Sequence, residues 1–257
     1  MGHALKDTLR RWLWPVLPGW PDHGRRIVQG PQVAGLLERA AAESSSFHSV
    51  LNAGAGEGGY SPFLLKLPGN RLLLESDYGY RTHRPSSFDT RQVFFCSSLV
   101  SIPLADAVCD LVLCTEVLEH IEEHDQALDE LARVTAPNGW LLITVPTPPA
   151  IPDANHVREG YKQPELAAML TKRGYRVVES RFCMHYFFRF VLANWSRWFC
   201  RPNMMISSLS MLDRWLHIGP PMDLLILAQL TGDRKPRGYA EATANGSLEP
   251  SGSGVRS

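Results

Sequence analysis

The sequence predicts an α/β fold: a doubly wound, mostly parallel sheet of seven strands. Short apolar runs recur along the chain, and segments long enough to be crossover helices separate most of them. A glycine-rich loop follows the first of these runs directly. Strands that alternate with helices form parallel sheets covered by helices on both faces, which is the architecture expected here.

Two amphipathic helices are expected before the sheet, within residues 1–44. Apolar residues recur at helical spacing in both, first at Leu5, Leu9, Trp12 and Leu13, then at Val33, Leu36, Leu37, Ala40 and Ala41. A proline-rich link between Pro15 and Pro31 is expected to separate the two helices.

The sheet itself is expected within residues 45–230. Its strands are predicted at residues 50–51, 72–74, 93–95, 111–113, 140–145, 175–180 and 222–229. Helices are predicted at residues 121–134 and 165–173, and an insertion occupies residues 181–215. Residues 231–257 are rich in Gly, Ser, Ala and charged residues, so a disordered tail is predicted there.

Charge and cysteine content restrict the function. The 26 basic residues balance the 26 acidic ones, so the chain lacks the net positive charge typical of nucleic-acid binding, and no nucleic-acid partner is expected. The five cysteines form no C-x-x-C pair, which disfavours a disulfide framework and a thiolate zinc site. No signal peptide or membrane-spanning helix is predicted, and a cytoplasmic location is expected.

The glycine loop runs from Gly54 to Gly59 and satisfies both G-x-G-x-x-G and G-x-G-x-G. Glycines let a backbone approach a ligand closely, and the helix expected to follow would add the positive end of its dipole. Glu75 follows the second predicted strand, where a carboxylate can accept hydrogen bonds from both hydroxyls of a ribose. Asp77 is the alternative for that role. The loop alone does not separate a nicotinamide dinucleotide from another nucleoside cofactor.

The region around the fourth predicted strand distinguishes between these two kinds of cofactor. Residues 102–120 read IPLADAVCDLVLCTEVLEH, and residues 136–143 read APNGWLLI. With the glycine loop, these segments closely resemble the class I S-adenosylmethionine-dependent methyltransferases of the type 11 group, whose Rossmann-like fold has seven strands. The resemblance covers residues 45–180. It implies an enzyme that transfers a methyl group from S-adenosyl-L-methionine.

The resemblance also implies roles for individual residues. The cofactor would contact Asn52, Ala53, Gly54, Ala55, Gly56, Glu75, Ser98, Leu99, Thr115, Glu116 and Val117. Within this set the loop residues would face the methionine part, Glu75 the ribose, and Ser98 and Leu99 the adenine. Thr115, Glu116 and Val117 would close the pocket.

Two positions depart from the family pattern. Asn52 stands where the family usually has an acid, and Ser98 stands where it usually has Asp. Both changes remove a negative charge that would complement the cofactor. A non-catalytic cofactor-binding homologue therefore stays open as an alternative, as does an NAD(P)-dependent oxidoreductase, which only the G-x-G-x-x-G pattern supports.

Histidines at two positions are candidate general bases for an acceptor that must lose a proton. His120 follows the fourth strand, and His156 lies in the loop after the fifth. Residues 120–124 also read H-x-x-E-H, which can mark a zinc peptidase helix on which His120 and His124 share a face with Glu123 beside them. A third ligand is missing from the sequence context, so no metal site is predicted.

The insertion at 181–215 is helical and aromatic-rich in this prediction. It holds nine aromatic residues and five arginines against one acid, Asp213. Such a surface could cover an acceptor pocket, form a dimer face or rest on anionic lipid, and simple packing on the sheet is an equal alternative. The expected acceptor is a small or lipid-like molecule, with peripheral membrane contact through 181–215. The sequence does not indicate an oligomeric state.

Overall fold

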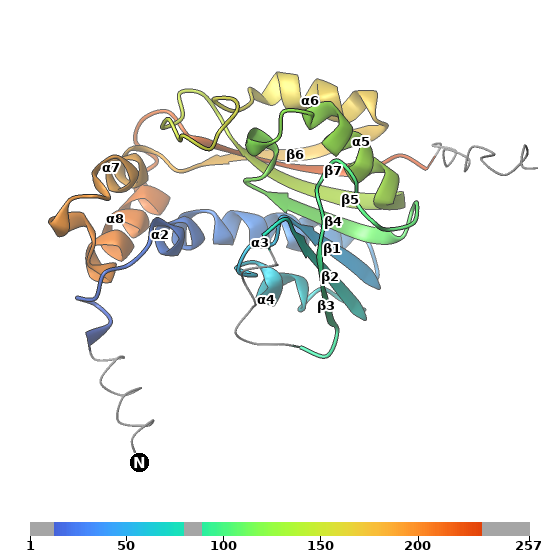
Figure 1. Ribbon diagram of the computed structural model, residues 1–257, viewed down its shortest axis with the longest axis horizontal. Coiled ribbons are helices and arrows are strands. Elements are labelled where there is room, and N and C mark those ends of the chain that lie inside the picture. The colour runs from blue at the N-terminus through green and yellow to red at the C-terminus, as the bar shows by residue number, and fades with distance from the viewer. Residues whose placement is uncertain (1–12, 80–88, 233–257) are drawn as a thin grey trace, which may run out of the picture.

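The computed structural model describes residues 13–79 and 89–232 (Figure 1). They form one seven-stranded sheet in the order β3-β2-β1-β4-β5-β7-β6. Strand β7 runs antiparallel to β5 and β6, and the other neighbouring strands run parallel. The doubly wound, mostly parallel sheet predicted from the sequence is confirmed.

Each predicted strand is present, and most are longer than the apolar run that predicted them. The strands are β1 (Ser49–Ala53), β2 (Leu72–Asp77), β3 (Gln92–Cys96), β4 (Cys109–Thr115), β5 (Thr135–Pro146), β6 (Tyr175–Cys183) and β7 (Asp223–Leu230). At the carboxyl ends of β1, β2 and β4 the added residues include the polar residues Asn52, Glu75, Asp77 and Thr115. That edge of the sheet is where doubly wound proteins place their binding sites.

Alternating side chains of the central strands build two apolar cores. Leu51, Val112 and Leu141 pack on one face against α5 (His124–Val134) and α6 (Gln163–Lys172). Val50 and Leu111 pack on the other face against α3 (Gly30–Glu43). Helices therefore cover both faces (Figure 1), so the open part of the sheet is its carboxyl edge.

Helix α2 (Pro21–Val28) lies in the segment predicted to be a link, so that prediction is wrong. Pro21 and Pro31 stand in the first turns of α2 and α3, where the chain needs no backbone N–H donor. Both prolines therefore begin helices instead of interrupting them. The first predicted helix lies almost entirely in residues 1–12, outside the described residues.

The predicted helix at 121–134 begins three residues later than expected. A short 3₁₀ turn, η1 (Leu118–His120), ends before Ile121, whose backbone is extended, and α5 starts at His124. His120 and His124 therefore do not share a helix face. The helix that was expected to follow the glycine loop is the single turn α4 (Ser61–Leu64), which is too short to have a substantial dipole.

The insertion is helical, as predicted. It forms α7 (Tyr186–Asn194), the turn η2 (Trp198–Cys200) and α8 (Asn203–Leu216), and α2 packs against both α7 and α8 at one end of the sheet (Figure 1). Its aromatic side chains do not gather into one cluster. Phe188 is fully buried, whereas Trp198 and Trp215 are 83% and 72% exposed. The tail predicted at 231–257 lies outside the described residues, except for its first two.

Asp213 joins the two helices of the insertion. Its carboxylate is fully buried on α8 and accepts hydrogen bonds from the backbone N–H groups of His185 (2.8 Å) and Phe188 (3.0 Å). These donors belong to the start of α7, where helices leave N–H groups without partners inside the helix. The only acid of the insertion therefore caps a helix. None of the described helices is long and apolar enough to span a bilayer.

Candidate active site

The glycine loop connects the end of β1 to the single turn α4. Gly54, Gly56 and Gly58 all have positive φ angles, of 74°, 53° and 74°, which side chains other than glycine rarely adopt. A Cβ atom on Gly54 would lie 2.2 Å from Cγ2 of Val117, whereas a Cβ on Gly56 would meet no atom within 4 Å. The loop is thus packed tightly against the end of β4 at Gly54 and is open at Gly56.

Strand β2 holds the loop in place. The carbonyl of Ser76 accepts hydrogen bonds from the N–H groups of Gly54 and Ala55, at 2.8 and 2.9 Å. Asp77, the last residue of β2, accepts one from the N–H of Gly56 at 2.8 Å, and its other oxygen accepts one from Gly79 at 2.7 Å. The Asp77 side chain is half-buried at the open end of the strand. Each of its oxygens keeps a further lone pair for a ligand hydroxyl.

Glu75 lies beneath the loop and has no exposed surface. Its two oxygens accept hydrogen bonds from the side-chain amides of Asn52 (3.3 Å) and Gln92 (2.7 Å). Burial separates this carboxylate from the open side of the loop, where a ribose would approach. The geometry therefore disfavours the ribose role expected for Glu75.

The pairing of Asn52 with Glu75 accounts for the first departure from the family pattern. Asn52 is 1% exposed and lies opposite Glu75 in the parallel register of β1 and β2. A second carboxylate at position 52 would face the first one in a dry site, whereas an amide donates a hydrogen bond to it. The Oδ1 atom of Asn52 is buried and has no hydrogen-bond partner among the described residues.

A pocket of about 210 Å³ opens between the glycine loop, the end of β4 and helix α2. Its lining consists of Asp22, Arg25, Arg26, Gly54, Ala55, Glu57, Gly59, Tyr60, Thr115 and Glu116. Four of the residues predicted to bind the cofactor, Gly54, Ala55, Thr115 and Glu116, are brought together there. The residues from α2 were not predicted, because the sequence assigned their segment to a link.

A buried polar network closes the inner end of this pocket. Glu116 forms an ion pair with Arg25 (2.5 Å) and accepts a hydrogen bond from the hydroxyl of Thr144 (2.7 Å). The amide of Gln29 donates to Glu116 at 3.3 Å and to Asp223, at the start of β7, at 2.6 Å. The network thus joins four elements that are distant in the sequence: α2, the end of β4, β5 and β7. Gln29, directly before α3, also belongs to it.

The two acids of this network differ in charge state. Burial by itself would raise the pKa of Glu116, but the Arg25 guanidinium holds that pKa below its usual range. Burial and the neighbouring Glu116 carboxylate raise the pKa of Asp223 well above its usual range. Burial and Glu116 likewise raise the pKa of Tyr60, whose hydroxyl hydrogen-bonds to Gln29. At the inner end of the pocket, the ionised carboxylate of Glu116 therefore faces the guanidinium of Arg25.

Ser98 and Leu99, the residues expected near the adenine, follow β3 directly. Leu99 is 5% exposed and belongs to the core, and Ser98 is half-buried. The Ser98 carbonyl accepts a hydrogen bond from the N–H of Ser101 at 3.2 Å, so a tight turn holds the segment. Neither residue lines the pocket described above, and their role at the adenine stays a prediction.

His120 and His156 are brought together, as two residues with a shared role would require. Their ring centroids are 4.7 Å apart, edge to face. His120 belongs to η1 after β4, and His156 belongs to the loop after β5. Neither lines the pocket, so their predicted role as general bases stays a prediction. Burial and the neighbouring His120 lower the pKa of His156.

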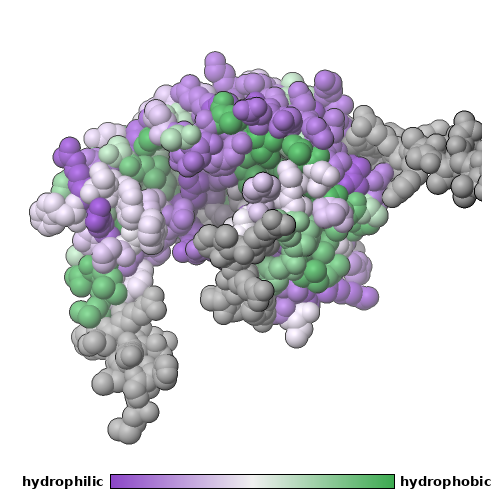
Figure 2. Space-filling view, in the orientation of Figure 1, coloured by the Kyte–Doolittle hydropathy of each residue, from purple (hydrophilic) through white to green (hydrophobic). Residues whose placement is uncertain are grey.

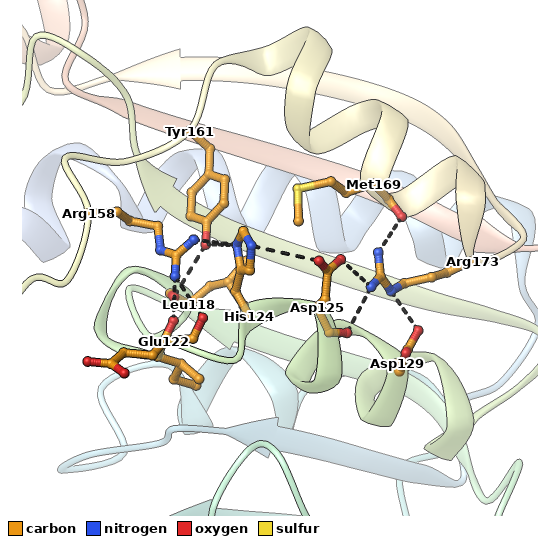
Figure 3. Close-up of polar contacts among 10 residues, drawn as sticks. Leu118, Glu122, His124, Asp125, Asp129, Arg158, Tyr161, Met169 and Arg173 are labelled. Atoms are coloured by element: carbon orange, nitrogen blue, oxygen red, sulfur yellow. Dashed lines mark hydrogen bonds and ion pairs between the residues drawn. The ribbon is translucent and has the colours of Figure 1, made fainter.

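The H-x-x-E-H string does not form a zinc site in this fold. His124 lies at the start of α5, and its Nδ1 atom accepts a hydrogen bond from Arg158 (2.6 Å) and lies 2.9 Å from the hydroxyl oxygen of Tyr161 (Figure 3). That nitrogen is therefore not free for a metal. Beside it, Arg173 binds Asp125 and Asp129 and ties the end of α6 to α5.

Strand order, glycine loop and the pocket at the carboxyl edge define a class I methyltransferase fold. A crystal structure of an S-adenosylmethionine-dependent methyltransferase from Mesorhizobium loti has the same fold, with a TM-score of 0.52 and 16% identity over 78% of this chain and 97% of that one. Residues 51–143 match the family model described as a methyltransferase domain, the type 11 group. Over residues 51–143 the chain is therefore similar to S-adenosylmethionine-dependent methyltransferases of this group.

Curated relatives match over the same part of the chain. A probable S-adenosylmethionine-dependent methyltransferase of Mycolicibacterium smegmatis is 29% identical over 112 residues, which is 43% of each chain. A tRNA (carboxymethyluridine(34)-5-O)-methyltransferase of Arabidopsis thaliana is 29% identical over 123 residues, 47% of this chain and 28% of that protein. The chain thus spans less than half the length of these relatives.

Proposed function

We propose that this protein transfers the methyl group of S-adenosylmethionine to a small or lipid-like acceptor. The observation that carries the proposal is the pocket between the glycine loop and α2, at the carboxyl edge of a methyltransferase sheet. The open face at Gly56 leaves room for the methionine part of the cofactor to lie against the loop backbone. A nicotinamide cofactor has no comparable support, and an intact pocket argues against a non-catalytic homologue.

For the cofactor, we propose that Asp77 takes the ribose in place of Glu75. Asp77 lies at the open end of β2 beside the loop, whereas Glu75 is enclosed by two amides. Gly54, Ala55 and Gly56 would pass along the methionine part, and Ser98 and Leu99 would flank the adenine. Thr115, Glu116 and Val117 would close the pocket at the end of β4.

The cofactor supplies an activated methyl group, so the protein mainly aligns the acceptor and excludes water. Bound S-adenosylmethionine would supply the methyl group to a lone pair of the acceptor, and the broken carbon–sulfur bond would leave S-adenosylhomocysteine. An acceptor that carries a hydroxyl or protonated nitrogen also releases a proton. His120 and His156 are the proposed recipients of that proton because they lie at the same edge of the sheet.

For the acceptor, the arginines of α2 indicate an anionic group. Arg25 and Arg26 both line the pocket; Arg25 is paired with Glu116, and Arg26 has no ion-pair partner among the described residues. Apolar surface gathers near this helix, over the first described residues at the lower left of Figure 2, where Leu13, Trp14 and Val16 are 44%, 41% and 63% exposed. Exposed Trp198 and Trp215 of the insertion extend the apolar surface available for lipid.

The ribose assignment can be tested by calorimetry. Asp77→Ala should weaken binding of 5′-methylthioadenosine by about tenfold or more, because charge-assisted hydrogen bonds are worth roughly 1.5 to 3 kcal/mol. The same variant should bind the 2′,3′-dideoxy analogue as the parent protein does. Glu75→Gln is the matched control and should change neither affinity by more than about threefold. The opposite ranking of the two variants would return the ribose to Glu75.

The reaction can be tested with S-adenosylmethionine that carries a labelled methyl group. Purified protein is incubated with separate lipid, small-molecule and RNA fractions of a cell extract, and the label is followed. Transfer into lipid or small anionic molecules, reduced by Arg26→Ala, supports the proposal. Label in RNA would show that the acceptor resembles that of the plant relative. A melting shift with NADH but not with S-adenosylhomocysteine would overturn the proposal.

A further inference from the structure

Three metal-binding side chains meet at the carboxyl edge of the sheet, beside the pocket but outside its lining. They are Glu119 and His120 of η1 and His156 of the loop after β5. One ligand atom from each lies within 4.8 Å of the other two. The group is separate from the H-x-x-E-H string, because it uses neither Glu123 nor His124.

Glu119 is the unusual member of this group. It is 1% exposed, and neither carboxylate oxygen has a hydrogen-bond partner among the described residues. A buried carboxylate without donors is costly and normally has a partner. The Nε2 atom of His120 lies 3.7 Å from Oε1 of Glu119. Glu119 therefore lies beside the two histidines with both oxygens unpartnered.

His120 is oriented as a metal ligand. Its Nδ1 atom is 3.0 Å from the backbone carbonyl of Asn155, so this nitrogen carries the proton and donates it. Nε2 is then unprotonated, with its lone pair on the side of Glu119. Histidines that bind metals are commonly fixed by such a bond from the second ring nitrogen to a carbonyl.

The loop that carries His156 is fastened to η1 and to the residues after it. The N–H of Val157 donates to the carbonyl of Glu119 at 3.0 Å. Arg158 donates to the carbonyls of Ile121 (2.8 Å) and Glu122 (3.1 Å), and Figure 3 shows its guanidinium beside His124 and Tyr161. The position of His156 therefore does not depend on a ligand.

We propose that Glu119, His120 and His156 bind one divalent cation such as Zn²⁺ or Mn²⁺. Two imidazoles and one carboxylate are the donor set of open transition-metal sites, in which the remaining positions accept water or an oxygen of a substrate. The site departs from the sequence prediction of no metal. The cation would bind whatever the acceptor is, but an imidazole whose lone pair binds the cation would not accept the proton of the acceptor.

The test measures metal binding directly on protein stripped with a chelator. Calorimetric titration with Zn²⁺ should give one site per chain, and Mn²⁺ should be displaced from the same site, followed by its EPR signal. His156→Ala and Glu119→Gln should each weaken binding by at least about 100-fold, since even residues that only orient ligands contribute 10- to 100-fold. His124→Ala and the exposed His48→Ala are the matched controls and should bind as the parent does.

Co²⁺ provides a second readout that does not rely on variants. Its visible absorption reports the nitrogen and oxygen ligands bound to it, and two nitrogens with one carboxylate are expected. Binding that survives in His156→Ala or Glu119→Gln, or that is lost in His124→Ala, would overturn the proposed site. Absence of binding at millimolar Zn²⁺ and Mn²⁺ to protein with an unchanged melting temperature would overturn it as well.

Discussion

Replacing Asn52 by Asp would place a second carboxylate beneath the glycine loop. The Asn52 amide now donates to Oε2 of Glu75 at 3.3 Å, in a site where both residues are at most 1% exposed. By the family pattern alone, Asp at this position should improve cofactor binding. The structure predicts the opposite, because the added charge would face Glu75 before it faces a ligand.

The variant could keep both carboxylates ionised or keep one of them protonated. The loss of unfolding free energy is set by whichever of these two states costs less. Two ionised carboxylates at this separation repel by ~5 kcal/mol at an effective dielectric constant of about 20. Keeping one of them protonated at pH 7.5 costs about 4 kcal/mol relative to an ordinary carboxyl. The variant should therefore lose about 4 kcal/mol of unfolding free energy at pH 7.5, or roughly 10 °C in Tm.

The dependence on pH has a definite sign. The folded variant would hold a proton that its unfolded chain releases above about pH 4, so its stability relative to the parent falls as pH rises. The deficit should shrink to about 1 kcal/mol near pH 5. Thermal unfolding of parent and variant at several pH values measures this difference, and calorimetry with S-adenosylhomocysteine measures binding.

The double variant Asn52→Asp, Glu75→Gln is the control, because it restores one carboxylate and one amide. It should recover most of the lost stability. An Asn52→Asp variant that melts at the parent temperature at pH 7.5 and binds S-adenosylhomocysteine more tightly would refute the reasoning. Such a result would mean that the side chains at positions 52 and 75 can move apart without a cost in stability. The cofactor, and not Glu75, would then determine which charge is favoured at position 52.

Two further substitutions test the packing around the site. Gly54→Ala should cost about 3 kcal/mol of unfolding free energy, because of the positive φ at this position and the clash with Val117. Gly56→Ala should cost about 1 to 2 kcal/mol, from the positive φ alone. Denaturant unfolding measures both losses, and adding Val117→Ala should restore stability only to the Gly54→Ala variant. Asp213→Ala should lose about 2 kcal/mol and the hydrogen-exchange protection of α7, because two capped N–H groups lose their acceptor. Unchanged protection would show that α7 does not need this cap.

The sheet could be predicted because its strands are short apolar runs with distinct spacing. Residues such as Leu111 and Leu113 are buried wherever the strand lies in the sheet, so the pattern survives without knowledge of the tertiary fold. Helix α2 could not be recognised in the same way. Its prolines suggest a link, and only the structure shows that Pro21 and Pro31 occupy first turns.

The candidate site was predictable where one local motif defines it. The glycine loop and the segment after β4 are each continuous in sequence, so Gly54 and Glu116, which line the pocket, could be proposed from local motifs. Glu75 and Asp77 both follow the same apolar run, and only the structure shows that Glu75 is buried against Asn52. Glu119 was overlooked because its neighbours in the sequence, Leu118 and His120, give no sign that this glutamate is buried.

The antiparallel strand β7 also determines how the chain must fold. It is inserted between β5 and β6, both of which precede it in the sequence. Until residues 223–230 arrive, the apolar edge of β5 has no permanent partner, and β6 must be kept from pairing with it directly. Closing such a distant contact is slow, and an open apolar edge favours association between chains. Completion of the sheet therefore waits for the last described strand, and a chain interrupted before it would expose the apolar part of β5 to aggregation.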